Sequence, residues 1–257
     1  MSDALLGKRI VVTRAADQAD DFAELLAAHG ATPLVVPAIL FQLQESPALN
    51  AAIRELASYS WIVFTSANAV RFFFERLQTE PQPAVRPQMA VVGSATERAL
   101  RACGHEPAFV PEVYTGEELG RTLPEVNGRR ILLPRAVKGT PEIVAELEAR
   151  GAVVDDIAIY RTVPAPLAPA MRAELEQGVD AVTFTSPSCV NGFLATAGAA
   201  VLRHALIACI GPTTAKAAAA GGLTVHIVAG EHTTAGLVEE LAGYFRDMRR
   251  EDGAGSQ

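Results

Sequence analysis

The stretch that decides the fold is Ile62-Val63-Phe64-Thr65-Ser66-Ala67-Asn68-Ala69-Val70, because the chain repeats it about 120 residues later. The second copy is Ala181-Val182-Thr183-Phe184-Thr185-Ser186-Pro187-Ser188-Cys189-Val190. At nearly the same offset, Arg9 to Arg14 returns as Arg130 to Arg135, and Val92-Gly93 returns as Ile210-Gly211. In a chain of 257 residues, this repeat predicts two similar lobes with a ligand cleft between them.

Short β-branched runs alternate with Ala-, Leu- and Glu-rich stretches of helical period. Strict alternation predicts an α/β fold in which each lobe is a parallel sheet with right-handed crossovers. Strands are expected at about 9–13, 33–37, 60–64, 89–92, 107–110, 130–133, 153–159, 180–184, 206–210 and 224–228. Helices are expected at about 17–29, 48–57, 67–77, 94–103, 116–122, 140–150, 168–177, 187–197, 212–220 and 234–246.

The composition narrows the class of protein. With 49% hydrophobic and 20% charged residues, the chain has enough apolar side chains for a substantial core. A formal net charge of −7 argues against nucleic acid or an anionic membrane surface as a partner. The sequence shows neither a membrane-spanning run nor an apolar signal core, so we expect a cytoplasmic location, and a monomer is compatible with these features.

Hydroxyl residues and glycines recur where strands run into helices. In parallel α/β sheets, ligands bind beyond the carboxyl ends of the strands, and a helix N-terminus attracts anions. For each single position, ordinary helix capping is the simpler explanation; for the repeated set, we favour binding of a ligand with many carboxylates or phosphates. The candidates are Thr65, Ser66, Gly93, Ser94, Thr185, Ser186, Gly211, Thr213, Thr214, Thr233 and Thr234.

Two helix starts, Ser94 to Glu97 and Thr115 to Glu118, have the spacing of capping boxes. Either Thr233 or Thr234 can face the ligand, and His232 beside them can add charge or be a plain surface residue.

Basic residues follow the first and sixth expected strands. Arg14, Arg135 and Lys138 can pair with carboxylates, although a solvated loop charge explains each of them equally well. Nucleotide-binding loops, serine-nucleophile motifs and metal-ligand spacings are missing from the sequence, and the three cysteines form no Cys-x-x-Cys pair. We therefore expect no cofactor, no metal and no covalent catalysis.

Taken in order and at their spacing, five short motifs make the chain resemble the uroporphyrinogen-III synthase family over essentially its whole length. They are Phe64-Thr65-Ser66-x-x-x-Val70, Val92-Gly93-x-x-Thr96, Ile159-Tyr160-Arg161-Thr162, Phe184-Thr185-Ser186-Pro187-Ser188 and Ile210-Gly211-Pro212-Thr213-Thr214-Ala215. The motifs add Thr96 and Ser188 to the expected substrate-binding residues.

The resemblance also implies how the chain is divided. Lobe one would be residues 1–36 with 165–257, and lobe two would be residues 42–160. Residues 37–41 and 161–164 would form a two-stranded hinge, so the chain would cross between the lobes twice. The repeat alone would suggest a single cut near residue 125.

The activity implied by the resemblance is cyclisation of hydroxymethylbilane, with loss of water and inversion of ring D, to uroporphyrinogen III. Tyr160 matches the family's tyrosine, whose phenol could protonate the leaving hydroxide; an ordinary tyrosine at a strand end is the alternative. Competing classes are a non-catalytic tetrapyrrole- or anion-binding module of the same fold, a two-lobe binding protein of the periplasmic type, and a nucleotide-sugar or methyl-donor enzyme.

Overall fold

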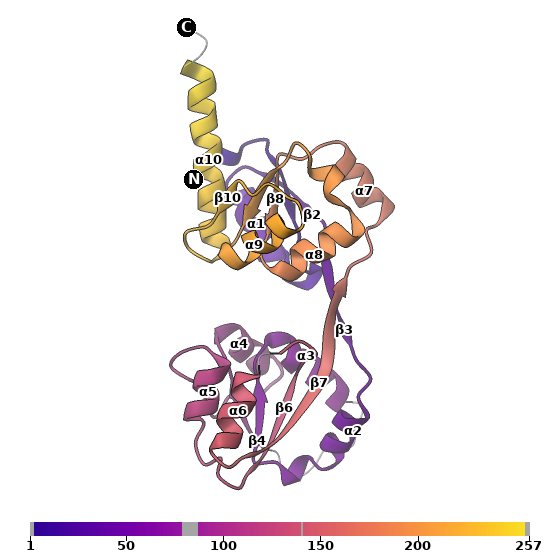
Figure 1. Cartoon of the computed structure of the whole chain (residues 1–257), viewed down its shortest axis with the longest axis vertical. Coiled ribbons are helices and arrows are strands. Elements are labelled where there is room, and N and C mark those ends of the chain that lie inside the picture. Colours follow the sequence, from indigo (N-terminus) through magenta and orange to yellow (C-terminus); the bar gives the residue numbers. More distant parts are fainter. Residues whose placement is uncertain (1–2, 79–86, 140, 255–257) are drawn as a thin grey trace. The chain divides into compact units, whose positions relative to one another are not determined.

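The computed structural model describes residues 3–78, 87–139 and 141–254. Contacts divide the chain into two units (Figure 1). Unit 1 comprises Met1–Leu40 and Thr162–Gln257, and unit 2 comprises Phe41–Arg161. The chain therefore passes from one unit to the other twice.

Unit 1 is built on a sheet with strand order β10-β9-β8-β1-β2, in which the paired strands are parallel. One face packs against α1 and α10 through Phe22 and Leu241, and Phe184 on the other face contacts Phe193 of α8 at 5.8 Å. Helices cover both faces, which explains why its central strands read as continuous apolar runs. The elements are β1 (Arg9–Val12), β2 (Thr32–Val35), β8 (Ala181–Phe184), β9 (Leu206–Cys209), β10 (Ile227–Val228), α1 (Asp20–Ala28), α7 (Pro169–Glu176), α8 (Pro187–Thr196), α9 (Pro212–Ala220) and α10 (Thr234–Ala254).

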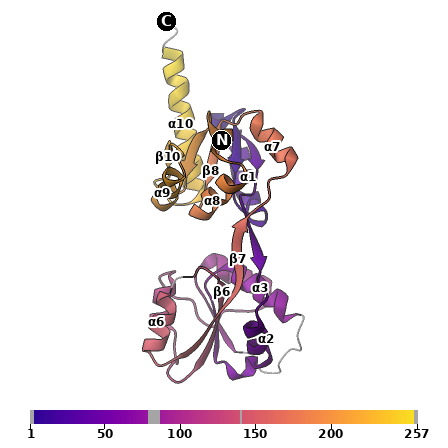
Figure 2. The same ribbon diagram turned by 45° about the vertical axis from the view of Figure 1, so that its right-hand side comes forward.

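Unit 2 is built on a sheet with strand order β3-β7-β6-β4-β5. Phe64 and Leu132 face a core closed by α2, α3 and α4, whereas Val63 and Leu133 face α5 and α6. Figure 2 shows α6 on one side of this sheet and α2 and α3 on the other. The elements are β3 (Ile39–Leu43), β4 (Trp61–Phe64), β5 (Gln88–Val91), β6 (Arg130–Ala136), β7 (Val153–Pro164), α2 (Pro47–Arg54), α3 (Ala67–Leu77), α4 (Ser94–Ala102), α5 (Gly116–Thr122) and α6 (Glu142–Ala149). Four short 3-10 helices complete the described chain: Asp3–Leu5, Ala16–Gln18, Leu56–Ser58 and Ala199–Leu202.

The two sheets exchange strands between the halves of the sequence. Ile10 of β1 pairs with Ala181 of β8, and Trp61 of β4 pairs with Ile131 of β6. Each copy of the repeated Phe-Thr-Ser strand therefore lies beside the opening strand of the other half. The orders β9-β8-β1-β2 and β5-β4-β6-β7 then correspond strand for strand. The expected α/β class, with two similar parallel-sheet units and two chain crossings, is confirmed.

Some expected elements have different bounds. Strand β6 runs past Pro134 to Ala136, because beyond Leu132 it has no pairing with β4 and a proline there removes no ladder bond. The expected strand at 107–110 is a single bridge between Ala90 and Phe109. Segments expected as connectors belong to strands β3 and β7, and the last helix continues from 246 to Ala254.

Candidate functional site

In unit 2, the carboxyl end of β4 leads directly into a capped helix. Ser66 is the N-cap of α3, and its Oγ accepts a hydrogen bond from the Ala69 N–H at 3.1 Å. Thr65 and Ser66 are both half-buried at this junction. One of the N–H groups that we expected to bind a ligand is therefore already hydrogen-bonded to the Ser66 hydroxyl.

Tyr160 of β7 lies against the same helix start. Its ring is 5% exposed, stacks on Phe72 at 5.3 Å and meets the edge of Phe41 at 6.0 Å. Its hydroxyl oxygen lies 2.9 Å from Ser66 Oγ. Burial raises the pKa of this phenol, whereas the Ser66 hydrogen bond and the charge of Arg71 act in the opposite direction. At neutral pH, Tyr160 is therefore a protonated group that can donate a hydrogen bond.

The next helix start in unit 2 is open. Helix α4 begins at Ser94 with Gly93 as its N-cap, and no side chain caps it within the described residues. The expected capping box is wrong, because Ser94 is already helical and the Glu97 carboxylate pairs with Arg101 at 2.9 Å. Ser94 is exposed, whereas Thr96 is buried. Gly93 has a φ of 82°, a conformation that favours glycine.

The expected basic residues of unit 2 lie in different settings. Arg135 does not follow strand β6 but belongs to it, and its Nε lies 2.5 Å from Asp156 Oδ1. Gly139 packs on its guanidinium, since an added Cβ would come within 2.9 Å of the Arg135 Cζ. Lys138 is exposed. Of this pair, Lys138 is the more accessible charge, and Arg135 already neutralises a carboxylate.

In unit 1, β8 leads into α8 as β4 leads into α3. Ser186 is the N-cap, and its Oγ accepts a hydrogen bond from the Cys189 N–H at 3.2 Å. The same hydroxyl contacts Cys189 Sγ at 3.2 Å, and Thr185 Oγ1 lies 3.9 Å from that sulfur. Ser188 is exposed in the first turn of the helix. Both copies of the repeat thus have a serine N-cap, but in the described structure a tyrosine contacts this serine only in unit 2.

Helix α9 repeats the open start of α4. Gly211 is its N-cap, and among the described residues no side chain caps this helix. Pro212 occupies the first helical position, where a proline removes no hydrogen bond. Thr213 is exposed, whereas Thr214 is buried like its counterpart Thr96.

A ring flanks each of these glycine caps. A Cβ on Gly211 would meet the His232 ring at 3.2–3.3 Å, and one on Gly93 would lie 3.9 Å from Tyr114. Tyr114 is 58% exposed, and His232 is exposed. The sequence analysis left Tyr114 out, although the offset that aligns Thr115 with Thr233 also aligns Tyr114 with His232. That repeat was the signal that could have found it.

The remaining expected binding residues of unit 1 are Thr233, Thr234 and Arg14, and only Thr233 among them caps a helix in the described structure. Thr233 caps α10, because its Oγ1 accepts a hydrogen bond from the Gly236 N–H at 3.0 Å and donates to Glu231 at 3.3 Å. Thr234 is the first residue of that helix and is half-buried. Arg14 follows β1 and is also half-buried.

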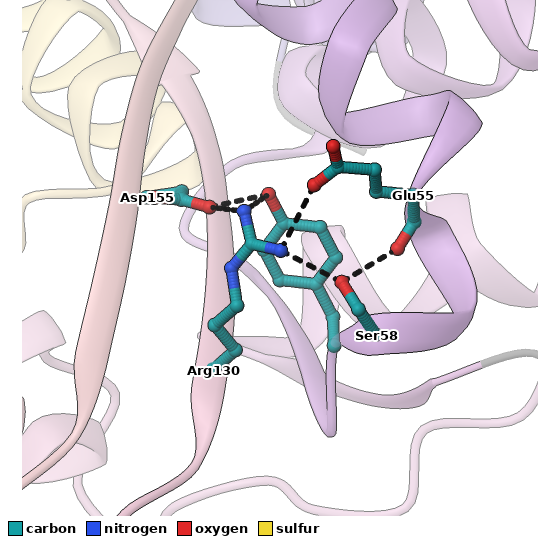
Figure 3. A network of polar contacts seen from close by, with 5 residues as sticks. Glu55, Ser58, Arg130 and Asp155 are labelled. Carbon is teal, nitrogen blue, oxygen red and sulfur yellow. Dashed lines mark hydrogen bonds and ion pairs between the residues drawn. The ribbon is translucent and has the colours of Figure 1, made fainter.

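At the amino ends of the strands, charged and polar side chains are hydrogen-bonded to one another. Figure 3 shows Arg130 at the start of β6, where it donates to Glu55 at 3.0 Å, to Ser58 at 2.8 Å and to Asp155 at 2.8 Å. Tyr59 also donates to Asp155, and the guanidinium lies 4.5 Å above its ring. The groups satisfy one another, so this network fits a structural clamp.

The repeat counterpart of Arg130 is held in the same way. Arg9 at the start of β1 pairs with Glu174 at 2.6 Å and donates to the Gly178 carbonyl at 2.8 Å. Two cavities of the described residues also lie near strand starts: one, lined by Asn127 and Arg150, precedes β6 and β7, and the other, lined by His204 and His226, lies at the starts of β9 and β10. The candidate binding groups therefore lie at the opposite, carboxyl ends of the strands.

The described residues offer little for other chemistries. No group of three or more His, Cys, Asp or Glu among them is placed to hold a metal ion. Burial raises the pKa of the Cys209 thiol to about 11, so it is a protonated core residue. None of the described helices is both long and apolar enough to cross a membrane.

Comparisons with known proteins agree on one family. Residues 20–239 match the family model described as HEM4, uroporphyrinogen-III synthase HemD. The chain is 32% identical to the uroporphyrinogen-III synthase of Synechococcus elongatus over 94% of this chain and 97% of that protein. It is 28% identical to the porphyrin biosynthesis protein HemD of Ruminiclostridium josui, of which it spans only 49%.

Solved structures show the same fold. The uroporphyrinogen-III synthetase of Helicobacter pylori superposes with a TM-score of 0.64 at 18% identity, covering 93% of this chain and all of that one. A mutant uroporphyrinogen III synthase of Thermus thermophilus gives 0.54 at 22% identity, covering 95% of this chain and all of that one. With the family match over most of its length, the chain belongs to the uroporphyrinogen-III synthase HemD family.

Proposed function

We propose that the chain converts hydroxymethylbilane into uroporphyrinogen III. In this reaction, water leaves the hydroxymethyl group of ring A, and ring D attacks the resulting azafulvene through its substituted carbon. The spiro intermediate then fragments and closes with ring D inverted. Family membership supports the reaction type, and the geometry at the strand carboxyl ends supports the roles of individual residues.

The substrate is a linear tetrapyrrole with many carboxylates. The open starts of α4 and α9 suit such a ligand, because their first N–H groups are not taken by a capping side chain in the described structure. Each such terminus carries about half a positive charge and stabilises a nearby anion by roughly 0.3–1 kcal/mol. Several weak contacts of this kind would hold the tetrapyrrole without any single dominant residue.

The candidate binding residues are assigned by their accessibility. Thr65, Ser94, Lys138, Thr185, Ser188, Thr213, Thr234 and Arg14 are exposed or half-buried, and we propose them as direct contacts. Ser66, Ser186 and Thr233 are also accessible, but their hydroxyls cap helices, and Arg135 pairs with Asp156, so we propose that these four support the site. Thr96 and Thr214 are buried, so their part is to shape the helix start. The rings of Tyr114 and His232 are added as neighbours of the glycine caps Gly93 and Gly211.

Tyr160 is the proposed proton donor to the leaving hydroxide. The observation that carries this role is its protonated phenol, which is held at the start of α3 by Ser66. Its raised pKa makes it a weak acid at neutral pH, so it assists departure of water by hydrogen bonding. Holding the substrate in the shape for spiro closure supplies most of the remaining acceleration.

The product isomer tests this proposal. Ring closure without inversion gives the symmetric type I isomer, which the substrate reaches unaided in solution. Fresh hydroxymethylbilane is incubated with the protein, and the ratio of type III to type I product is measured after oxidation and chromatography. A ratio well above the protein-free control is expected. A ratio equal to that of the control would contradict the proposal and favour the non-catalytic binding module.

A further inference from the structure

We infer that Ser66 is a positioning residue for Tyr160, and that the start of helix α3 and the phenol act as one device. The inference rests on the proposed function, because it gives the phenol of Tyr160 a catalytic task. It assigns Ser66 a role through Tyr160 in place of direct contact with substrate.

The two hydroxyls are joined by a short contact between distant parts of the sequence. Ser66 Oγ and Tyr160 Oη lie 2.9 Å apart, although 94 residues separate them in the chain. Ser66 Oγ already accepts a hydrogen bond from the Ala69 N–H at 3.1 Å, as the N-cap of α3. Its own proton is then available to Tyr160. With Ser66 as donor, the phenol keeps its O–H for a second acceptor, the leaving hydroxide of the substrate.

The surroundings of Tyr160 fix its ring, and within the described residues Ser66 forms a hydrogen-bond contact that can orient its hydroxyl. Phe72 stacks on the ring at 5.3 Å, Phe41 meets it at 6.0 Å, and neither can form a hydrogen bond. Arg71 is the charged group that acts on this phenol in the described part of the chain, and its effect lowers the pKa. The Ser66 hydrogen bond also lowers the pKa, so losing it should leave the phenol a weaker acid.

Unit 2 supplies a matched control. Ser46 caps α2 just as Ser66 caps α3, with its Oγ accepting from the Leu49 N–H at 3.2 Å. Ser46→Ala therefore removes an equivalent cap in the same unit without touching Tyr160. Any effect of Ser66→Ala that Ser46→Ala lacks is not a general effect of losing a cap.

The first experiment is a double-mutant cycle on the rate of hydroxymethylbilane conversion. Ser66→Ala should lower kcat about fivefold, the size expected for one ordinary hydrogen bond, with KM little changed. The same substitution in a Tyr160→Phe background should have no further effect. Ser66→Thr should recover most of kcat, and Ser46→Ala should keep it. A fivefold loss that persists in the Tyr160→Phe background would overturn the inference.

The second experiment needs no activity and stays informative if the proposed reaction is wrong. The protein is labelled with 3-fluorotyrosine, its four tyrosine signals are assigned with Phe variants, and each is titrated by fluorine NMR. The Tyr160 signal should titrate at higher pH in Ser66→Ala than in the wild type or Ser46→Ala. Superimposable Tyr160 titrations in all three proteins would contradict the inference, whatever the product assay shows.

Discussion

At the scale of single residues, the proposed chemistry depends on one phenol and two glycines. Two aromatic rings pack against Tyr160, and the Ser66 hydroxyl contacts its phenol. Gly93 and Gly211 begin helices whose first N–H groups no described side chain caps. In the proposed cyclisation, the phenol would act as the proton donor and these helix starts would bind carboxylates of the substrate.

Replacing Tyr160 by Phe removes the hydroxyl and keeps the aromatic packing. We expect kcat to fall about 10- to 100-fold, at or below the lower end of the range for a general acid, because burial already makes this phenol a weak acid. Type III selectivity should persist, since it depends on how the substrate is held. Rate and isomer ratio are measured together. Complete loss of activity in a folded variant would show that the phenol dominates catalysis.

Gly211→Ala tests the open start of α9. The backbone there is extended, so alanine adds no strain, but its Cβ would press on the His232 ring at 3.2–3.3 Å. KM for hydroxymethylbilane should rise several-fold with little change in kcat, which steady-state kinetics measures. Gly230→Ala is the control, because its Cβ would meet only Glu240 at 3.5 Å. An unchanged KM in Gly211→Ala would show that the start of α9 does not bind the substrate.

At the scale of elements, the sequence predicted where helices begin better than it predicted contacts between different elements. Capping was the simpler explanation for Ser66 and Ser186 taken singly, because a hydroxyl after a buried strand is a local signal, and both residues are N-caps, although the repeated set was assigned to ligand binding. The box at Ser94 failed because Gly93, which has a positive φ and no side chain, occupies the N-cap position and Ser94 is already helical. The Ser66–Tyr160 contact had no local signal at all, since it joins β7 to α3 across 94 residues.

The two errors in strand prediction have different causes. Strand β3 lies at the edge of its sheet, and Gln42 and Leu43 in it are exposed, so it lacks the buried apolar pattern of a central strand. Strand β6 was cut short at Pro134 because a proline usually ends a central strand. As a result, Arg135 was expected in a loop, whereas it lies in the strand paired with Asp156.

The clamp at the amino ends of β6 and β7 should make stability depend on pH. Burial, followed by the hydrogen bond to Asp155, raises the pKa of Tyr59 above its ordinary value of 10.0. The folded protein therefore holds this proton after the unfolded chain has released it. The stabilisation is complete below about pH 10 and is lost as pH rises toward the folded pKa, at up to about 1.4 kcal/mol per pH unit.

Urea unfolding between pH 8 and 11 measures this effect. The free energy of unfolding should fall above pH 10 in the wild type and fall less steeply in Tyr59→Phe. Tyr114→Phe is the control, because that ring is 58% exposed. Equal slopes in the wild type and Tyr59→Phe would show that the clamp does not hold the tyrosine proton.

At the scale of the whole molecule, the repeat in sequence does not mark the division in space. Each sheet takes strands from both halves of the chain, since β1 pairs with β8 and β4 pairs with β6. The repeat and the strand–helix alternation predicted two parallel sheets. Which sheet receives which strand depends on contacts between segments more than 60 residues apart, and only the family resemblance implied the exchange.

Fragments of the chain test the exchange. Residues 41–161 contain nearly the whole sheet of unit 2 and should unfold cooperatively, whereas residues 1–125 lack β6 and β8 and should not. Trp61, the single tryptophan, reports directly because it is buried and pairs with Ile131 of β6. Its fluorescence is followed during urea unfolding of both fragments. A cooperative transition in 1–125 would contradict the exchanged sheets.

The central claim is that this chain sets the isomer in which the tetrapyrrole closes. The most direct measurement is the product isomer ratio in a single turnover, with the protein in excess over fresh hydroxymethylbilane. The account predicts almost entirely type III product, formed faster than the substrate cyclises alone. Type I product at the rate and proportion of the protein-free control would contradict it.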